Sequence, residues 1–146
     1  MKIKVQAIPE EGFTLTENID PANWKLETPE LKFIEPVRIA AVFQKQHDSV
    51  FVQVTAQAEQ ELICDRCATS YKASYQESFD LDYLIKETPV LDISDDVRQE
   101  IILDYPIRFL CKENCLGLCA HCGKNLNEGP CSCVPSTSRG VSHAVT

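Results

Sequence analysis

Residues 111–133 read CKENCLGLCAHCGKNLNEGPCSC, which is the most distinctive stretch of the sequence. It places six cysteines within 23 residues, in the order Cys111, Cys115, Cys119, Cys122, Cys131 and Cys133. A Cys-x-x-Cys pair, Cys64 and Cys67, lies 43 residues upstream. Eight thiols make two sets of four, and four thiolates at short spacing are the ligands of a tetrahedral zinc ion. The sequence therefore predicts a fold organised by one or two structural Zn2+ ions.

The length of 146 residues suits one domain with a core of its own. No apolar run approaches the roughly 18 residues of a membrane span. Residues 1–6 lack an apolar signal-peptide region, so we expect a cytoplasmic protein without a membrane partner. Thiols stay reduced in that compartment, which favours metal ligands over disulfides.

The formal net charge of −8 argues against a generally basic, nucleic-acid-coating surface. The charge is uneven, because residues 111–146 carry a net +1 and the rest of the chain carries −9. Basic side chains recur beside the cysteines, namely Arg66, Arg108, Lys112 and Lys124. They either offset the thiolate charge or form a patch for RNA phosphates or a partner. The acidic whole favours the first interpretation.

Residues 37–63 predict a β-hairpin that turns at residues 46–49. Apolar side chains alternate with polar ones along its second half and define a face along its first half. The members of that face are Val37, Ile39, Ala41, Phe43, Val50, Val52, Val54, Ala56 and Ala58.

The clearest period-two pattern follows, and it predicts a long antiparallel strand with one face in water. Its apolar members are Tyr71, Ala73, Tyr75, Phe79, Leu81, Tyr83 and Ile85. Glu77 interrupts this face and predicts a bulge. An aromatic stripe of this kind can stack bases, but alternate strand positions favour a role in the core.

A short helix is predicted after this strand, with Ser94 as its N-cap. Val97 and Ile101 lie one turn apart, and Pro106 ends the helix near Asp104. Before residue 37 we expect a strand at residues 2–6 and a helical turn that starts at Asp20-Pro21. Residues 134–146 lack periodicity and predict a disordered tail.

The preferred grouping of the cysteines makes two sites. Cys64 and Cys67 join Cys111 and Cys115, while Cys119, Cys122, Cys131 and Cys133 form the second set, because short loops cost less closure entropy. The rival grouping joins Cys64 and Cys67 to Cys119 and Cys122. A single site with spare thiols, or His121 in place of a cysteine, remains an alternative.

Three catalytic interpretations fit the sequence less well. The spacing Cys115-x3-Cys119-x2-Cys122 is that of radical SAM enzymes, which need a longer chain of alternating strands and helices. A redox Cys-x-x-Cys sits at a helix N-terminus, whereas Cys64 follows a strand and Asp65 opposes its ionisation. None of the three histidines has a recognisable catalytic neighbourhood. We expect no enzyme and no small-molecule substrate.

The order of these features resembles a known family. A Cys-x-x-Cys pair after a strand precedes a helix with an acidic start, Glu100-Ile-Ile-Leu, and a proline. Then come Cys115-Leu-Gly-Leu-Cys119-x-x-Cys122-Gly-x-Asn-Leu-Asn and a closing Cys131-x-Cys133. The order is similar to that of the bacterial and plastid YceD family, the large ribosomal RNA subunit accumulation proteins, over about residues 35–133. The resemblance implies an assembly or processing factor that promotes accumulation of 23S ribosomal RNA, and not a nuclease.

The expected fold class is α+β, mainly antiparallel β-sheet with a short helix and a C-terminal Cys-rich zinc-binding lobe. One YceD-like domain spans residues 1–133, with a β-rich core and helix at 35–110 and the lobe at 111–133. The expected partner is the large ribosomal subunit precursor or its rRNA, or a basic ribosomal protein. The alternative is a zinc-stabilised protein–protein adaptor with no direct RNA contact.

Overall fold

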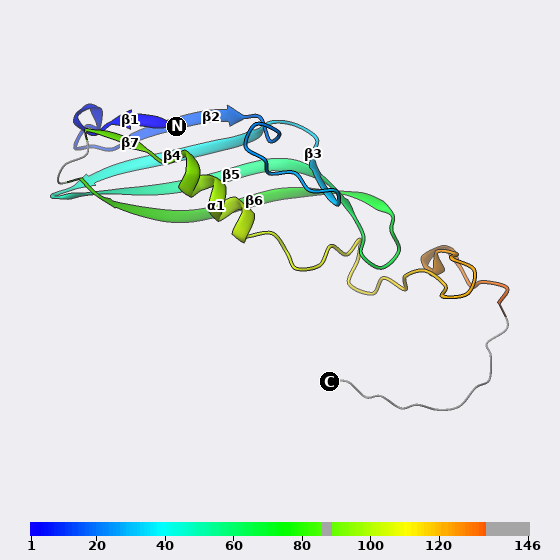
Figure 1. Cartoon of the computed structure of the whole chain (residues 1–146). Helices are drawn as coiled ribbons and strands as arrows, with labels where there is room; N and C mark the ends of the chain where they lie inside the picture. Colours follow the sequence, from blue (N-terminus) through cyan, green and yellow to red (C-terminus); the bar gives the residue numbers. More distant parts are fainter. Residues whose placement is uncertain (86–88, 134–146) are drawn as a thin grey trace.

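The computed structural model describes residues 1–85 and 89–133 and is built on a five-stranded antiparallel sheet. Its strands run in the order β2, β4, β5 and β3, and β6 pairs with β5 on the opposite side. The bounds are β2 Phe13–Ile19, β3 Leu31–Phe33, β4 Val37–Gln46, β5 Ser49–Ile63 and β6 Ser70–Leu84. A two-stranded ribbon, β1 Lys2–Lys4 with β7 Val90–Asp92, and the helix α1 Ser94–Leu103 complete the β-rich part. Figure 1 shows the cysteine-rich segment at the far end of the sheet from β1. The α+β class with a Cys-rich lobe is confirmed.

The predicted hairpin is confirmed as β4 and β5. Gln46 pairs with Ser49 across the turn, where His47 has a positive φ of 45°. The apolar face is buried along both strands, and Phe43, Val52 and Val54 are at most 1 % exposed. Burying a side chain of this size contributes roughly 1.5–3 kcal/mol, so this face drives the hairpin into the core.

The long strand β6 is confirmed, but the bulge at Glu77 is wrong. Pairing with β5 runs without a break from Ile63↔Ser70 to Ser49↔Leu84, and Glu77 faces Ala56 in normal register. Glu77 is exposed although it shares the apolar face, so its carboxylate reaches water without a bulge. Tyr75 is buried edge-on against Phe33, and the other aromatic side chains of the stripe pack on the core. The core interpretation of the stripe is confirmed.

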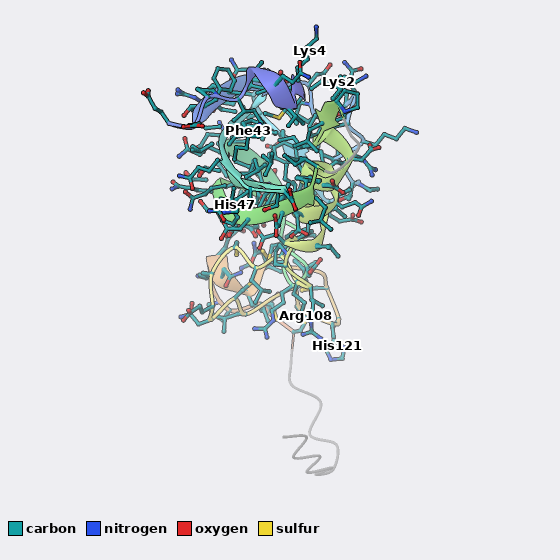
Figure 2. All side chains as sticks on the ribbon, turned by 90° about the vertical axis from the view of Figure 1, so that its left-hand side faces the viewer. Lys2, Lys4, Phe43, His47, Arg108 and His121 are labelled. Carbon is teal, nitrogen blue, oxygen red and sulfur yellow. The ribbon has the colours of Figure 1, made fainter. Side chains whose placement is uncertain are left out.

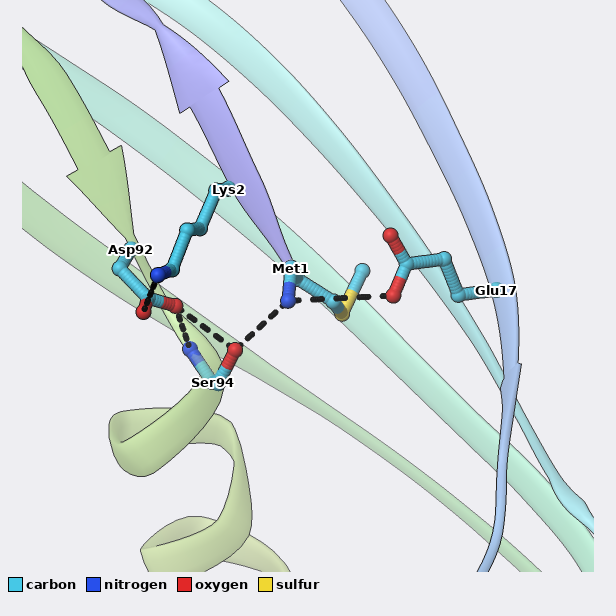
Figure 3. Close-up of polar contacts among 5 residues, drawn as sticks. All are labelled: Met1, Lys2, Glu17, Asp92 and Ser94. Carbon is cyan, nitrogen blue, oxygen red and sulfur yellow. Dashed lines mark hydrogen bonds and ion pairs between the residues drawn. The ribbon is translucent and has the colours of Figure 1, made fainter.

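The helix α1 lies over the sheet in Figure 1 and buries Val97 and Ile101 completely. It ends at Leu103, as predicted. Its N-terminal cap differs from the prediction, since Ser94 lies inside the helix and its backbone N–H donates to Asp92 Oδ1 at 3.1 Å. The Ser94 hydroxyl instead accepts a 2.6 Å hydrogen bond from the Met1 amine (Figure 3). The N-cap residue is therefore Ile93, whose side chain makes no capping hydrogen bond, and Asp92 accepts from the first N–H of the helix.

The first 36 residues contain more strand than we predicted. β1 is shorter than expected, because Val5–Ala7 form a 3-10 helix, and β2 was not predicted. β2 pairs with β4, from Phe13↔Phe43 to Ile19↔Val37. The turn at Asp20 is present, and Asp20 Oδ1 accepts from the Ala22 N–H at 3.0 Å.

Among the described residues, no helix has both the length and the apolar character needed to cross a membrane. The tail predicted at residues 134–146 lies outside the described residues.

Candidate metal centres

Four sulfurs converge where the β5–β6 hairpin meets the segment after α1. We call Cys64, Cys67, Cys111 and Cys115 the first cluster; their sulfur atoms all lie within 4.8 Å of one another. The Cys64–Cys115 and Cys67–Cys111 sulfur pairs are each 3.7 Å apart. Tetrahedral zinc with Zn–S bonds of about 2.3 Å places its sulfurs about 3.8 Å apart. The first cluster therefore has the size of a tetrahedral four-sulfur site.

The remaining four cysteines form the second cluster, which is more exposed. Cys119, Cys122, Cys131 and Cys133 also have all four sulfurs within 4.8 Å, with Cys131 and Cys119 separated by 3.4 Å. Cys122 is exposed, whereas three sulfurs of the first cluster belong to buried residues. None of the eight cysteines forms a disulfide. The structure thus has the preferred grouping of the cysteines. It does not have the rival grouping, in which Cys64 and Cys67 join Cys119 and Cys122.

The two Cys-x-x-Cys turns share one backbone design that the sequence analysis did not find. In the first turn the Ala68 N–H donates to the Cys64 carbonyl at 2.9 Å, and in the second the Gly123 N–H donates to the Cys119 carbonyl at 2.9 Å. Both Ala68 and Gly123 have a positive φ, of 55° and 74°. In both turns, the residue directly after the second cysteine has the left-handed conformation. Glycine is the residue that adopts this conformation most easily, and the first turn has alanine there.

Hydrogen bonds fix the first turn to the segment that carries Cys111. The Asp65 N–H donates to the Phe109 carbonyl, and the Phe109 N–H donates to Asp65 Oδ2, both at 2.8 Å. Arg66 Nη1 donates to the Cys115 carbonyl at 3.1 Å. Asp65 thus connects the first Cys-x-x-Cys turn to the segment that carries Cys111. This structural role explains why a carboxylate lies beside the thiols.

Asn127 contacts a sulfur of the first cluster, a role that was not predicted from the sequence. Its Nδ2 donates to the Cys115 sulfur at 3.3 Å, and its Oδ1 accepts from the Leu116 N–H at 2.9 Å. Asn125 holds Asn127 in turn and donates to Thr69 Oγ1 at 3.1 Å. The Asn-x-Asn sequence after Gly123 therefore connects the second cluster to a sulfur of the first.

Hydrogen bonds to sulfur lower the pKa of particular thiols. Burial raises the pKa of Cys64, but backbone N–H groups of Cys67, Cys111 and Arg66 outweigh it and lower the value to about 6. The side-chain amide of Asn127 lowers the pKa of Cys115. Such donors stabilise thiolate, the form that binds metal.

Neighbouring thiols have the opposite effect on one member of each cluster. Burial, followed by contacts with Cys67 and Cys115, raises the pKa of Cys111 to about 12. Contact with Cys122, followed by burial, raises that of Cys133 to about 12. Four thiolates at these separations repel one another unless a divalent cation lies among them, so the donor set suits a cation such as Zn2+.

The four basic residues predicted as a patch have different surroundings. All are exposed, and Figure 2 places Arg108 at the end of the molecule opposite Lys2 and Lys4. Arg66 binds the Cys115 carbonyl, and Lys124 Nζ donates to the Pro130 carbonyl at 3.1 Å within the second cluster's loop. Arg66 and Lys124 therefore bind the backbone of the cluster loops, whereas the exposed side chains of Arg108 and Lys112 have no hydrogen bond or ion pair within residues 1–85 and 89–133.

Residues 80–140 match the family described as "Large ribosomal RNA subunit accumulation protein YceD". Two curated relatives are both described as "Large ribosomal RNA subunit accumulation protein YCED homolog 1, chloroplastic". The Zea mays protein is 42 % identical over 53 residues, 36 % of this chain and 18 % of that protein. The Arabidopsis thaliana protein is 38 % identical over 47 residues, 32 % of this chain and 15 % of that protein.

These matches cover less than a fifth of either plant protein, and no solved structure matches the chain. The family match starts later than the resemblance seen in the sequence, which began at about residue 35. It contains α1 and six of the eight clustered cysteines. The resemblance of this chain to the YceD family is thereby confirmed over residues 80–140.

Proposed function

We propose that this protein is a non-enzymatic factor in biogenesis of the large ribosomal subunit, acting in the cytoplasm to promote accumulation or processing of 23S rRNA. The observation that carries the proposal is the family match over residues 80–140, which includes the whole second cluster and two cysteines of the first. The family and both plant relatives are named for accumulation of large-subunit ribosomal RNA.

Each cluster holds one Zn2+ in this proposal, with a structural role. Four cysteine ligands fill the tetrahedral shell and leave no position for substrate or catalytic water. The ions would fix the turn after β5 and the Cys-rich lobe in one arrangement, and they would hold Arg108 and Lys112 outward. These two residues are the best candidates for contact with rRNA phosphates, since Arg66 and Lys124 already bind backbone carbonyls.

The second candidate is a zinc-stabilised adaptor that recruits a protein and does not touch RNA. Two observations favour it. The net charge is −8, and two of the four basic side chains near the cysteines, Arg66 and Lys124, donate hydrogen bonds to backbone carbonyls of the chain itself. An acidic protein attracts basic partners, which ribosomal proteins commonly are.

Deletion of the gene tests the ribosomal role. We expect sucrose-gradient profiles of the deletion strain to show a deficit of large subunits and of mature 23S rRNA. The native protein should restore both, whereas a variant without the first cluster should not. Normal large-subunit levels and normal rRNA processing in the deletion strain would refute the proposal.

Crosslinking separates the two candidates. Ultraviolet crosslinking of the protein to rRNA in subunit precursors, reduced in an Arg108→Ala/Lys112→Ala variant and unchanged in a Lys2→Ala/Lys4→Ala control, supports direct RNA contact. Crosslinks to proteins alone support the adaptor.

A further inference from the structure

The strand β6 leaves one long edge of the sheet open. Among the residues that the structure describes, it pairs with β5 alone, and does so along all 15 of its residues. Within residues 1–85 and 89–133, its outer edge makes no backbone hydrogen bond to another element. Figure 1 shows β6 as the last strand on this side of the sheet. Proteins usually interrupt or cover an edge of this length with proline, a bulge or another element, and β6 has no proline and no bulge.

Carboxylates flank this edge on both faces of the sheet. On the face that carries α1, Glu77, Glu100 and Asp104 line a hollow of about 210 Å³ together with Ser78, Phe79 and Leu103. On the opposite face, Asp80 and Asp82 are exposed. Residues 74–84 contain no lysine or arginine.

These carboxylates lack cationic partners within the part of the chain that the structure describes. The ion pairs found there involve the Met1 amine with Glu17, and Lys2 with Asp92. Burial, with Glu77 as a nearby charge, raises the pKa of Asp104. Like charges held together without a cation cost free energy that a positively charged ligand would relieve.

Apolar surface accompanies the charge. Leu103 lines the hollow and is 76 % exposed, and Leu84 at the end of β6 is also 76 % exposed. An extended segment on the edge would place alternate side chains on the two faces of the sheet. Basic side chains would then meet Glu77, Glu100 and Asp104 on one face and Asp80 and Asp82 on the other.

We propose that the outer edge of β6 binds an extended, lysine- or arginine-rich segment of a partner protein, which adds to the sheet as a further strand. Backbone hydrogen bonds supply the register, and the flanking carboxylates select the basic sequence. In an antiparallel β6–β6 pair centred on Glu77, the two Glu77 side chains would face each other, which disfavours a second copy of this chain although Lys72 would lie opposite Asp82. The proposal goes beyond the ribosomal role, since it uses neither cluster and holds for any basic partner.

The test uses the full-length metal-loaded protein and a fluorescein-labelled peptide of about eleven residues that repeats Lys-Lys-Val-Thr, so that lysines fall on both faces of an added strand. Fluorescence anisotropy measures binding. We expect Glu77→Lys/Asp80→Lys to weaken binding about tenfold or more. The matched control is Glu10→Lys/Glu11→Lys, which changes the net charge equally but lies in the loop before β2 and leaves binding unchanged.

A second peptide with the same side chains, but N-methylated at alternate residues, tests strand addition. It keeps the charge and loses backbone donors, so it should bind about tenfold more weakly or worse. Amide hydrogen exchange of residues 70–84 should slow when the unmodified peptide binds.

Three results would overturn the proposal. Equal binding of the methylated peptide would show attraction without pairing. Equal weakening by the control variant would place the peptide elsewhere. A dimer in light scattering without peptide, abolished by Glu77→Lys/Asp80→Lys, would make a second copy the occupant. None of these results bears on the deletion phenotype, so the two proposals can fail separately.

Discussion

Ala68 and Gly123 occupy the same place in the two Cys-x-x-Cys turns, with φ of 55° and 74°. The left-handed region costs an L-residue roughly 1–2 kcal/mol, while glycine costs about 0.5–1 kcal/mol in chain entropy. We therefore expect Ala68→Gly to raise the free energy of unfolding by about 0.5 kcal/mol. Gly123→Ala should lower it by about 1 kcal/mol, although a Cβ at Gly123 meets no atom within 4 Å.

Urea unfolding of the metal-loaded protein measures both variants. The free energy of unfolding should change in opposite directions in the two variants, because one adds glycine to a left-handed position and the other removes it. A change in the same direction would contradict this argument.

Asn127 acts on the first cluster through its hydrogen bond to the Cys115 sulfur. Loss of a donor to a metal ligand typically costs about 10–100-fold in metal affinity. We expect that loss in Asn127→Ala, measured by competition with a colorimetric chelator. Asn114→Ala is the control, since Asn114 is exposed in the same segment. Equal zinc release from both variants would show that the bond to sulfur does not matter.

Tyr105 connects the end of α1 to the turn before β3. Its hydroxyl donates to the Leu26 carbonyl at 2.6 Å. Burial raises the pKa of Tyr105 to about 12. The ordinary tyrosine pKa is about 10, so the contribution of this hydroxyl to stability is complete below about pH 10 and is lost as pH rises toward 12.

Tyr105→Phe should therefore cost about 1 kcal/mol at pH 8, the worth of one hydrogen bond. The difference between wild type and variant should shrink as pH rises above about 10. Urea unfolding across this range measures it, and the other tyrosines are common to both proteins. A difference that stays constant with pH would contradict the assignment.

The two clusters differ in which parts of the chain they join. The first cluster closes a loop from Cys67 to Cys111, with 43 residues between them, whereas the second closes only the local segment from Cys119 to Cys133. Closing a loop of the first size in the unfolded chain is worth about 4 kcal/mol on the scale used for disulfides.

We expect two zinc ions per chain by elemental analysis of protein purified without added metal. Cys122→Ser/Cys133→Ser should retain one ion and a melting temperature close to that of the wild type. Cys64→Ser/Cys67→Ser should lower the melting temperature by many degrees, because the anchor between β5, β6 and the segment after α1 is lost. Fewer than one ion per chain, or equal melting temperatures in the two variants, would contradict a metal-organised fold.

Much of this protein follows from local pattern. Alternating side chains determine β4, β5 and β6, because one buried face of a strand requires period two. Val97 and Ile101 determine the buried side of α1, and the spacing of the cysteines is enough to favour the grouping that forms, since short loops close most readily.

The tertiary structure decided whatever depends on distant segments. No local sequence pattern predicts the pairing of Lys2 with Asp92 or of β2 with β4. The same holds for the hydrogen bonds from Asn127 to the Cys115 sulfur, and from Arg66 and Lys124 to backbone carbonyls. The open acidic edge of β6 is of the same kind, because an edge exists only where no other strand has paired. Local pattern reflects the burial of one face, while partners and edges are set by which segments the whole chain brings together.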